Sequence, residues 1–354
     1  MPRYLVPILI AGCLALSAGA SFARPEYARK ENKMCGYCHV NPNGGGSRNP
    51  RGVFYAMHNH TFDGYDEAKV MGADPTKRSG PPAYHSAWKV DAPVTTRRIV
   101  VADVMDDHTP RLLLLNDHNV VGVYKLNGTK LDKEDEVDMS DGAPKFVAGH
   151  FAKGKPAILA APGMVAFRAD GKFVRKPTPD VTELTGYVRY WDGTENYFIY
   201  QGGGVPQSYA VDTAAAKPVI DGKEMSDPSG SVQVYSEITI HPGPELLTGI
   251  GLPDAATKSG VAGIYAPRSD GKLYTWAPWL DADGSSSIHV SEFSGFGGQG
   301  GDQKAAWTSP KLAGKVLDIS LGSDPKNPMQ PGLYVLEATG DGGMARTVEF
   351  FALD

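Results

Sequence analysis

Hydrophobic residues follow three different patterns along the chain. Residues 5–20 form one apolar run, which ends before Arg24 and Pro25. The segment Pro25–Met34 has the start signals of a short helix, 53–62 is a second short apolar segment, and 66–71 has room for one or two helical turns. From about residue 95 onward, short runs of Val, Ile, Leu, Tyr and Phe alternate with turn residues. This last pattern predicts many short β-strands and no long helix.

The first apolar run predicts a secretion signal over residues 1–23. Arg3 precedes the run, and small residues stand at Ser21 and Ala23, the two positions that a signal peptidase reads. The run is short for a membrane span of about 20 residues, so we expect no transmembrane segment in the mature chain. A retained anchor is one alternative, and a lipoprotein cut that leaves a lipidated Cys13 is another. The expected location is periplasmic or extracellular.

A cysteine motif lies just after the first predicted helix. Removal of the signal takes Cys13 with it and leaves Cys35 and Cys38, which His39 follows directly. The pattern Cys-x-x-Cys-His is typical of covalent haem attachment, because two thiols form thioethers with one haem and the adjacent histidine binds its iron. We therefore predict one haem c. Zinc bound with a downstream histidine, a thioredoxin-like redox pair and a strained disulfide are the alternatives.

A second iron ligand is expected beyond the glycine- and asparagine-rich loop 41–52. His58 is the preferred candidate, followed by Met57 and His60, and an open position stays as a further alternative. Met71 is also within reach of the motif in sequence. A histidine would keep the reduction potential low, whereas a methionine would raise it.

The region after residue 95 contains repeated units. Segments 123–131, 166–174 and 264–273 each join an apolar strand to an Asn-Gly or Asp-Gly turn, which is a strong hairpin signal. Segments 99–115 and 146–160 each contain two apolar runs separated by a polar turn. The spacing of about 40–50 residues is that of a four-stranded propeller blade. We predict a small all-α haem domain over 24–79, a linker over 80–94 and an all-β propeller of six or seven blades over 95–354.

Two family resemblances follow from these residues. The segment 26–40 resembles the N-terminal helix of small bacterial cytochromes c, which implies a monohaem domain. The repeats at 101–104 and 147–159 resemble FG-GAP or VCBS propeller repeats. That family's calcium loop is not carried over, because residues 105–109 and 152–154 lack most of its carboxylates. Asp281, Asp283 and Gly284 keep only a fragment of it, so calcium is not expected.

Charge separates the two predicted parts. The formal net charge is −5, yet residues 24–79 are net positive by three. Negative overall charge without a basic stripe argues against nucleic-acid binding. The leading hypothesis is an exported monohaem electron carrier, not an enzyme, that exchanges electrons with a redox partner protein, with the propeller as a docking or structural platform. The alternatives are a propeller oxidoreductase that uses the haem as electron acceptor and a haem-based sensor.

Overall fold

The fold is seen in a computed structural model. It describes residues 25–38, 50–57, 60–66, 78, 80–105, 107, 109–139, 145–149, 156–161, 164–177, 186–190, 196–202, 205–212, 217–224, 236–240, 262–265, 267–268, 272, 274–280, 285–292 and 305–354. The predicted signal peptide, with Cys13, lies outside these residues.

The N-terminal part contains short helical elements. Helix α2 spans Pro25–Glu31, the 3-10 turn η1 spans Cys35–Tyr37, and helix α3 spans Pro50–Met57. The expected all-α haem domain is not seen in the described part of the chain. Helices of 7 and 8 residues are below the length of about 12–15 residues at which an isolated helix becomes marginally stable, so they depend on packing.

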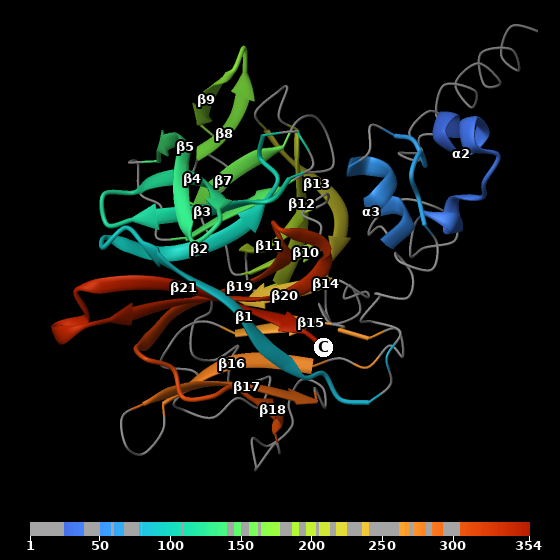
Figure 1. Ribbon diagram of the computed structural model, residues 1–354. Helices are drawn as coiled ribbons and strands as arrows, with labels where there is room; N and C mark the ends of the chain where they lie inside the picture. The colour runs from blue at the N-terminus through green and yellow to red at the C-terminus, as the bar shows by residue number, and fades with distance from the viewer. Residues whose placement is uncertain are drawn as a thin grey trace, which may run out of the picture.

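The remainder of the described chain is almost entirely β-structure, arranged as several antiparallel sheets (Figure 1). Three of them have four strands each. The first contains β2 (Thr96–Ala102), β3 (Arg111–Asn116), β4 (Val120–Asn127) and β5 (Lys130–Asp138). The second contains β6 (Lys145–Gly149), β7 (Ala157–Ala161), β8 (Met164–Ala169) and β9 (Lys172–Pro177).

We call the third four-stranded sheet the closing sheet, because it joins the two ends of the β-region. Its strands, in spatial order, are β1 (Tyr84–Ala92), β21 (Ala345–Leu353), β20 (Asn327–Thr339) and β19 (Lys315–Asp324). The 3-10 turn η4 (Asp341–Gly343) links β20 to β21. Residues 84–92, which the sequence placed in a linker, are therefore a strand, and the linker prediction is wrong for them.

A larger sheet has nine strands. In spatial order they are β13 (Lys217–Glu224), β12 (Val205–Asp212), β11 (Asn196–Gly202), β10 (Gly186–Tyr190), β14 (Ser236–Ile240), β15 (Ala262–Tyr265), β16 (Tyr274–Leu280), β17 (Ser286–Glu292) and β18 (Ala305–Thr308). The predicted antiparallel, mostly β architecture is thus confirmed.

Two of the predicted Asn-Gly and Asp-Gly hairpins are present. Asn127 pairs with Lys130 at the end of β4, and Gly128 has a positive φ of 61°. Between β8 and β9, Asp170 and Gly171 have φ values of 51° and 78°. Positive φ at both central residues is what a type I′ turn requires, and Asp-Gly tolerates it at little cost.

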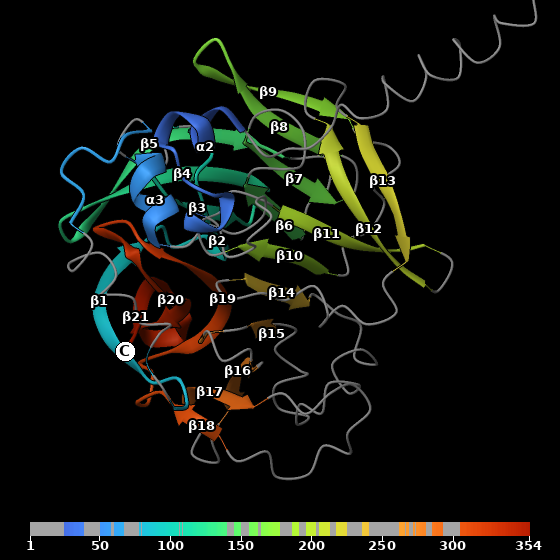
Figure 2. The ribbon, with the colours of Figure 1, turned by 90° about the vertical axis from the view of Figure 1, so that its right-hand side faces the viewer.

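Hydrophobic cores lie between neighbouring sheets. One cluster joins the β2–β5 sheet to the β6–β9 sheet, a second joins the β2–β5 sheet to the closing sheet, and a third joins the closing sheet to β15–β17. Because alternate residues of a strand point to opposite faces, Val100 enters the first cluster while Ile99 enters the second. Figure 2 shows these sheets following one another around the molecule, a β-propeller-like arrangement.

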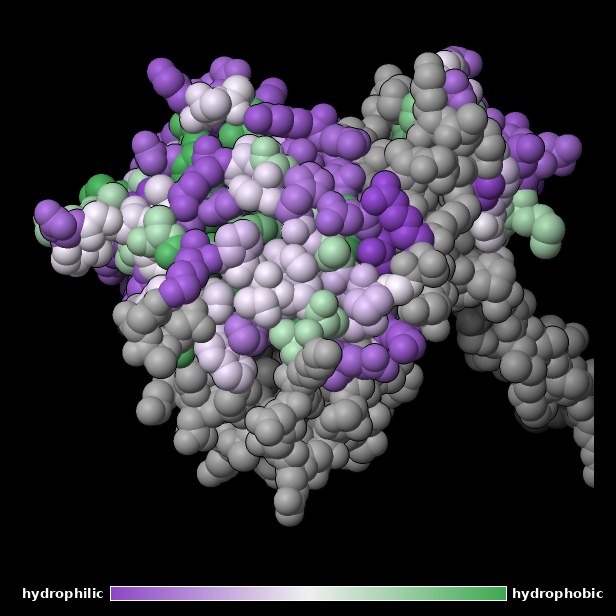
Figure 3. All heavy atoms as spheres, turned by 60° about the horizontal axis from the view of Figure 1, so that its bottom comes forward, coloured by the Kyte–Doolittle hydropathy of each residue, from purple (hydrophilic) through white to green (hydrophobic). Residues whose placement is uncertain are grey.

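This two-sided burial explains the uninterrupted apolar runs in the sequence. Leu112, Leu113, Leu114 and Leu115 are all buried, because β3 is covered on both of its faces. On the face shown in Figure 3, the coloured hydrophobic side chains are scattered among hydrophilic ones. Within the described residues, no helix is long and apolar enough to cross a membrane.

Candidate functional site

The cysteine motif lies on a tight turn between the two helices. Asn32, with a positive φ of 51°, ends α2, and η1 begins three residues later. The amide of Cys38 donates to the carbonyl of Cys35 at 3.1 Å, which closes the turn. Cys35 and Cys38 are not joined in a disulfide, and both have intermediate exposure. His39 lies outside the described residues.

The turn sets the spacing of the two thiols. In a 3-10 turn the side chains at positions i and i+3 are nearly eclipsed, and Cys35 and the C-cap residue Cys38 have this spacing. A spacing of three residues across a short turn suits attachment of both sulfur atoms to a single flat group. The residues that the structure describes at this point therefore fit the two thioether bonds of a covalent haem.

Aromatic side chains surround the turn. Tyr55 of α3 is 5% exposed and contacts Tyr27, His60 and Phe62, with ring centroids 5.7, 5.5 and 4.7 Å away. Tyr37, between the two cysteines, contacts Phe62 at 5.6 Å. We call this set the aromatic cluster; it also includes Phe54 and Tyr65. It provides an apolar wall beside the motif.

Tyr55 is also the polar link between the two helices. Its hydroxyl donates to Glu31 Oε1 at 3.0 Å, so α3 is fastened to the last residue of α2. Burial, assisted by this hydrogen bond and by the charge of Glu31, raises the pKa of Tyr55 well above its ordinary value. The phenol therefore stays protonated and keeps donating to the carboxylate at any physiological pH.

Two cations lie over Tyr37. Lys33 Nζ is 4.8 Å and Arg51 Cζ is 4.7 Å from the centroid of its ring. Such cation–π contacts contribute about 0.5–1 kcal/mol each at exposed sites. They add positive charge next to the cysteines, in line with the net positive charge of this part of the sequence.

Of the candidate second ligands of the iron, the structure describes the side chain of His60 alone. His58 and the side chain of Met57 lie outside the described residues, as does Met71. His60 is described: its ring stacks on Tyr27 at 4.5 Å, and its carbonyl accepts from Lys30 Nζ at 2.6 Å. His60 is thus held in the aromatic cluster. The sequence analysis missed this role of the tyrosines, although six aromatic residues between positions 27 and 65 signalled a packed cluster.

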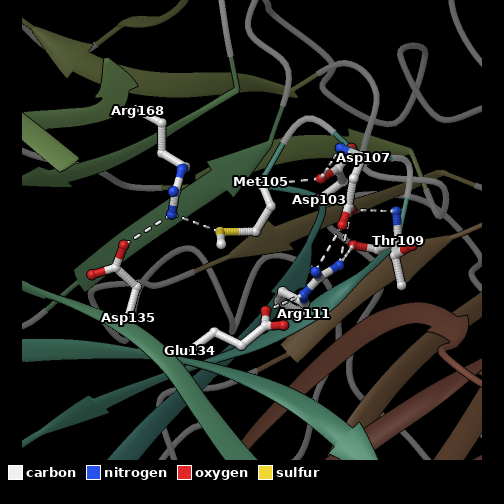
Figure 4. Close-up of polar contacts among 8 residues, drawn as sticks. All are labelled: Asp103, Met105, Asp107, Thr109, Arg111, Glu134, Asp135 and Arg168. Carbon is white, nitrogen blue, oxygen red and sulfur yellow. Dashed lines mark hydrogen bonds and ion pairs between the residues drawn. The ribbon is translucent and has the colours of Figure 1, made fainter. Parts of the chain in front are cut away.

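A second polar cluster lies where the propeller family would have a calcium loop (Figure 4). Arg111, with a side chain only 4% exposed, donates to Asp107 at 2.8 and 2.9 Å and to Glu134 at 2.6 Å. Arg168 of the next sheet donates to Asp135 at 2.9 Å and to the sulfur of Met105 at 3.3 Å. The guanidinium of Arg111 therefore supplies the positive charge that these two carboxylates, Asp107 and Glu134, face. The fragment Asp281, Asp283 and Gly284 lies outside the described residues.

Comparisons with known proteins give no family for this chain. No family model matches it, and no curated protein matches it. Similar solved structures include BBS1N in complex with ARL6DN, soaked with mercury, with a TM-score of 0.37, 11% identity and coverage of 76% of this chain and 97% of that one. The same complex soaked with lead gives 0.37, 9%, 75% and 96%. AofleA from Arthrobotrys oligospora gives 0.36, 9%, 75% and 86%.

These findings correct the two family resemblances. Within the described residues, no group of three or more His, Cys, Asp or Glu side chains could hold a metal ion, so the resemblance to cytochromes c is not supported. No family model supports the FG-GAP or VCBS resemblance either. A five-residue motif and a hairpin pattern are local signals, and they do not specify the helices or loops that define a whole family.

Proposed function

We propose that Cys35, Cys38 and His39 attach one haem covalently and that the protein transfers electrons to or from a redox partner protein. The proposal depends on the chemistry of these three residues and claims no family membership. The observation that carries it is the pair of thiols spaced i, i+3 across one 3-10 turn, from Cys35 to the C-cap residue Cys38. When bound, a haem supplies a one-electron redox centre.

The chain's own residues have separable roles in this proposal. Cys35 and Cys38 hold the group, and His39 supplies the proximal nitrogen. His58, with Met57 and His60 as alternatives, is the candidate for the opposite side of the iron. The aromatic cluster provides an apolar surface beside the motif, and Tyr55 holds α2 and α3 together there.

We further propose that the β-region is a propeller of six or seven blades that acts as a platform. Helix α3 contacts β20 of the closing sheet, so the N-terminal part has a contact with the platform. The proposed location is periplasmic or extracellular, because thioether attachment and the predicted signal both suit an exported protein.

Expression of the full chain together with a working cytochrome-maturation apparatus tests the haem proposal. We expect a coloured protein whose alkaline pyridine spectrum is of the thioether type and whose haem resists acid-acetone extraction. Cys35→Ser and Cys38→Ser should each lose one thioether and shift that spectrum, and His39→Ala should lose the normal spectrum. Cys13→Ser is the matched control and should retain full haem content. A colourless wild-type protein, from cells that mature a reference cytochrome, overturns the proposal.

A further inference from the structure

Asp318 joins two sheets that share no strand pairing. It lies on β19 of the closing sheet, is 3% exposed, and its Oδ2 accepts the backbone N–H of Ile99 at 2.8 Å. Ile99 belongs to β2, the edge strand of the β2–β5 sheet. A buried amide at a sheet edge needs an acceptor from elsewhere, and the Asp318 carboxylate provides it.

The other oxygen of Asp318 is poorly satisfied. Its Oδ1 faces Arg98 Nη1 at 3.5 Å, which is too long for a good hydrogen bond. Burial raises the pKa of Asp318 to about 6, against the lowering effects of Arg98 and of the amides of Ile99 and Ile319. The ionised carboxylate at neutral pH is therefore buried with one oxygen in weak contact, an arrangement that costs free energy.

We propose that Asp318 is a pH-sensitive latch between the closing sheet and the β2–β5 sheet, and that mild acid tightens it. Arg98 on β2 is the charged side chain that acts on this carboxylate, and the amides of Ile99 and Ile319 face it from β2 and from β19 itself. The latch is independent of the haem proposal. It makes the packing of the closing sheet against the β2–β5 sheet, which we call the seam, sensitive to the pH of the surroundings.

The sign follows from linkage. A carboxyl whose pKa is higher in the folded protein than in the unfolded chain binds its proton more tightly in the folded state. Between pH 6 and about 4 the seam therefore gains stability as the pH falls, and above pH 6 the cost of the buried charge is fully present. The test therefore isolates Asp318 by substitution.

The matched variants are Asp318→Asn and Asp324→Asn. Asparagine is isosteric and keeps an acceptor for the Ile99 amide but does not titrate. Asp324 is buried in the same sheet, and its carboxylate accepts from Trp88 Nε1 at 3.2 Å and from the amide of Lys326 at 2.9 Å. Melting temperatures of the full chain are measured from pH 4.5 to 8 for all three proteins.

We expect Asp318→Asn to melt above the wild type at pH 8 and the difference to close towards pH 4.5. Asp324→Asn, measured in the same way, is the reference for the replacement of another buried carboxylate in the closing sheet. Parallel curves for the wild type and Asp318→Asn overturn the latch.

A measurement on the unaltered protein covers the case in which Asp318→Asn does not fold. Hydrogen exchange at the Ile99 amide, corrected for its intrinsic pH dependence, should slow by about tenfold or more between pH 7.5 and pH 5, since one pKa unit corresponds to a factor of ten. Either of two results overturns the proposal. One is that the corrected protection of the Ile99 amide does not rise as the pH falls, and the other is that the carboxyl resonance of Asp318 titrates below pH 4.5.

Discussion

The N-terminal part and the β-region are stabilised in different ways. In the β-region, three clusters of buried aliphatic and aromatic side chains fill the space between sheets. Among residues 25–38, 50–57 and 60–66, Tyr55 is the one hydrophobic side chain that is buried, counting only the residues whose burial the structure describes. The contacts there include ring–ring contacts, cation–π contacts and a phenol–carboxylate hydrogen bond. The β-region thus has a core, whereas the N-terminal part has partly exposed rings beside the two cysteines.

Because of this difference, we expect mutations in the β-region and mutations beside the cysteines to affect different properties. Removal of a core side chain in the β-region leaves a cavity that closely packed neighbours cannot fill. Removal of a ring beside the cysteines exposes the motif but leaves the sheets intact. Global stability and the chemistry of the motif are therefore separable properties of this chain.

The largest effect is expected from Phe350→Ala in the closing sheet. Phe350 is 0% exposed and packs against Trp88 and Tyr334, with ring centroids 5.4 and 4.7 Å away. Loss of a buried phenyl group costs about 3–5 kcal/mol of unfolding free energy. Urea denaturation followed by tryptophan fluorescence measures it. Phe62→Ala in the aromatic cluster is the matched control and should lower the same free energy much less; equal losses would contradict the separation of the two regions.

A smaller loss of unfolding free energy is expected from Arg111→Met. This change removes the guanidinium and leaves the carboxylates of Asp107 and Glu134 without it, although both are partly exposed to water, at 47% and 27%. After allowance for solvent screening, we expect a loss of about 1–3 kcal/mol. Chemical denaturation measures it, and Arg111→Lys should recover part of the loss. A variant as stable as the wild type would show that the cluster contributes no net stability.

Tyr55→Phe sharpens the comparison, because it alters the N-terminal part alone. The ring stays in the aromatic cluster, but the hydrogen bond to Glu31 is lost, at a cost of about 1 kcal/mol. We expect faster limited proteolysis between α2 and α3 and an unchanged midpoint for unfolding of the sheets. Glu31→Gln keeps an acceptor for the phenol and should have the milder effect. A shifted midpoint for the sheets would show that the two regions unfold together.

The smallest effect is expected from Lys133→Ala on β5. Lys133 forms an ion pair with Glu136, and both side chains are about half exposed, at 47% and 57%. Exposed pairs contribute about 0–1 kcal/mol, so the unfolding free energy should change by less than about 0.5 kcal/mol. Thermal melts at low and high salt test this. A larger loss that disappears in high salt would assign β5 a greater electrostatic role.

Local signals in the sequence predicted the strands well. The Asp170-Gly171 turn formed a hairpin because its φ requirements are set by two adjacent residues, and Gly128 supplies the positive φ in the β4–β5 turn. The unbroken run Leu112–Leu115 likewise corresponds to a strand buried on both faces. The cysteine motif is a local pattern of five residues as well, and its haem function stays a prediction.

Distant partners were not predictable in the same way. Residues 84–92 read as a linker because Pro81, Pro82 and Pro93 flank them, yet they pair with β21 at the other end of the chain. The aromatic cluster also depended on helices that approach each other in space. Neither pairing leaves a periodic pattern within one segment.

The sequence by itself determined the short strands, their tight turns and the spacing of the two cysteines, because turn chemistry and alternation act over a few neighbouring residues. Only the tertiary structure decided that β1 closes against β21, that Tyr55 binds Glu31, and that Asp318 of β19 serves the Ile99 amide of β2. These contacts join residues far apart in sequence, and their free energy depends on burial and on complementary edges that exist only once the sheets have packed together.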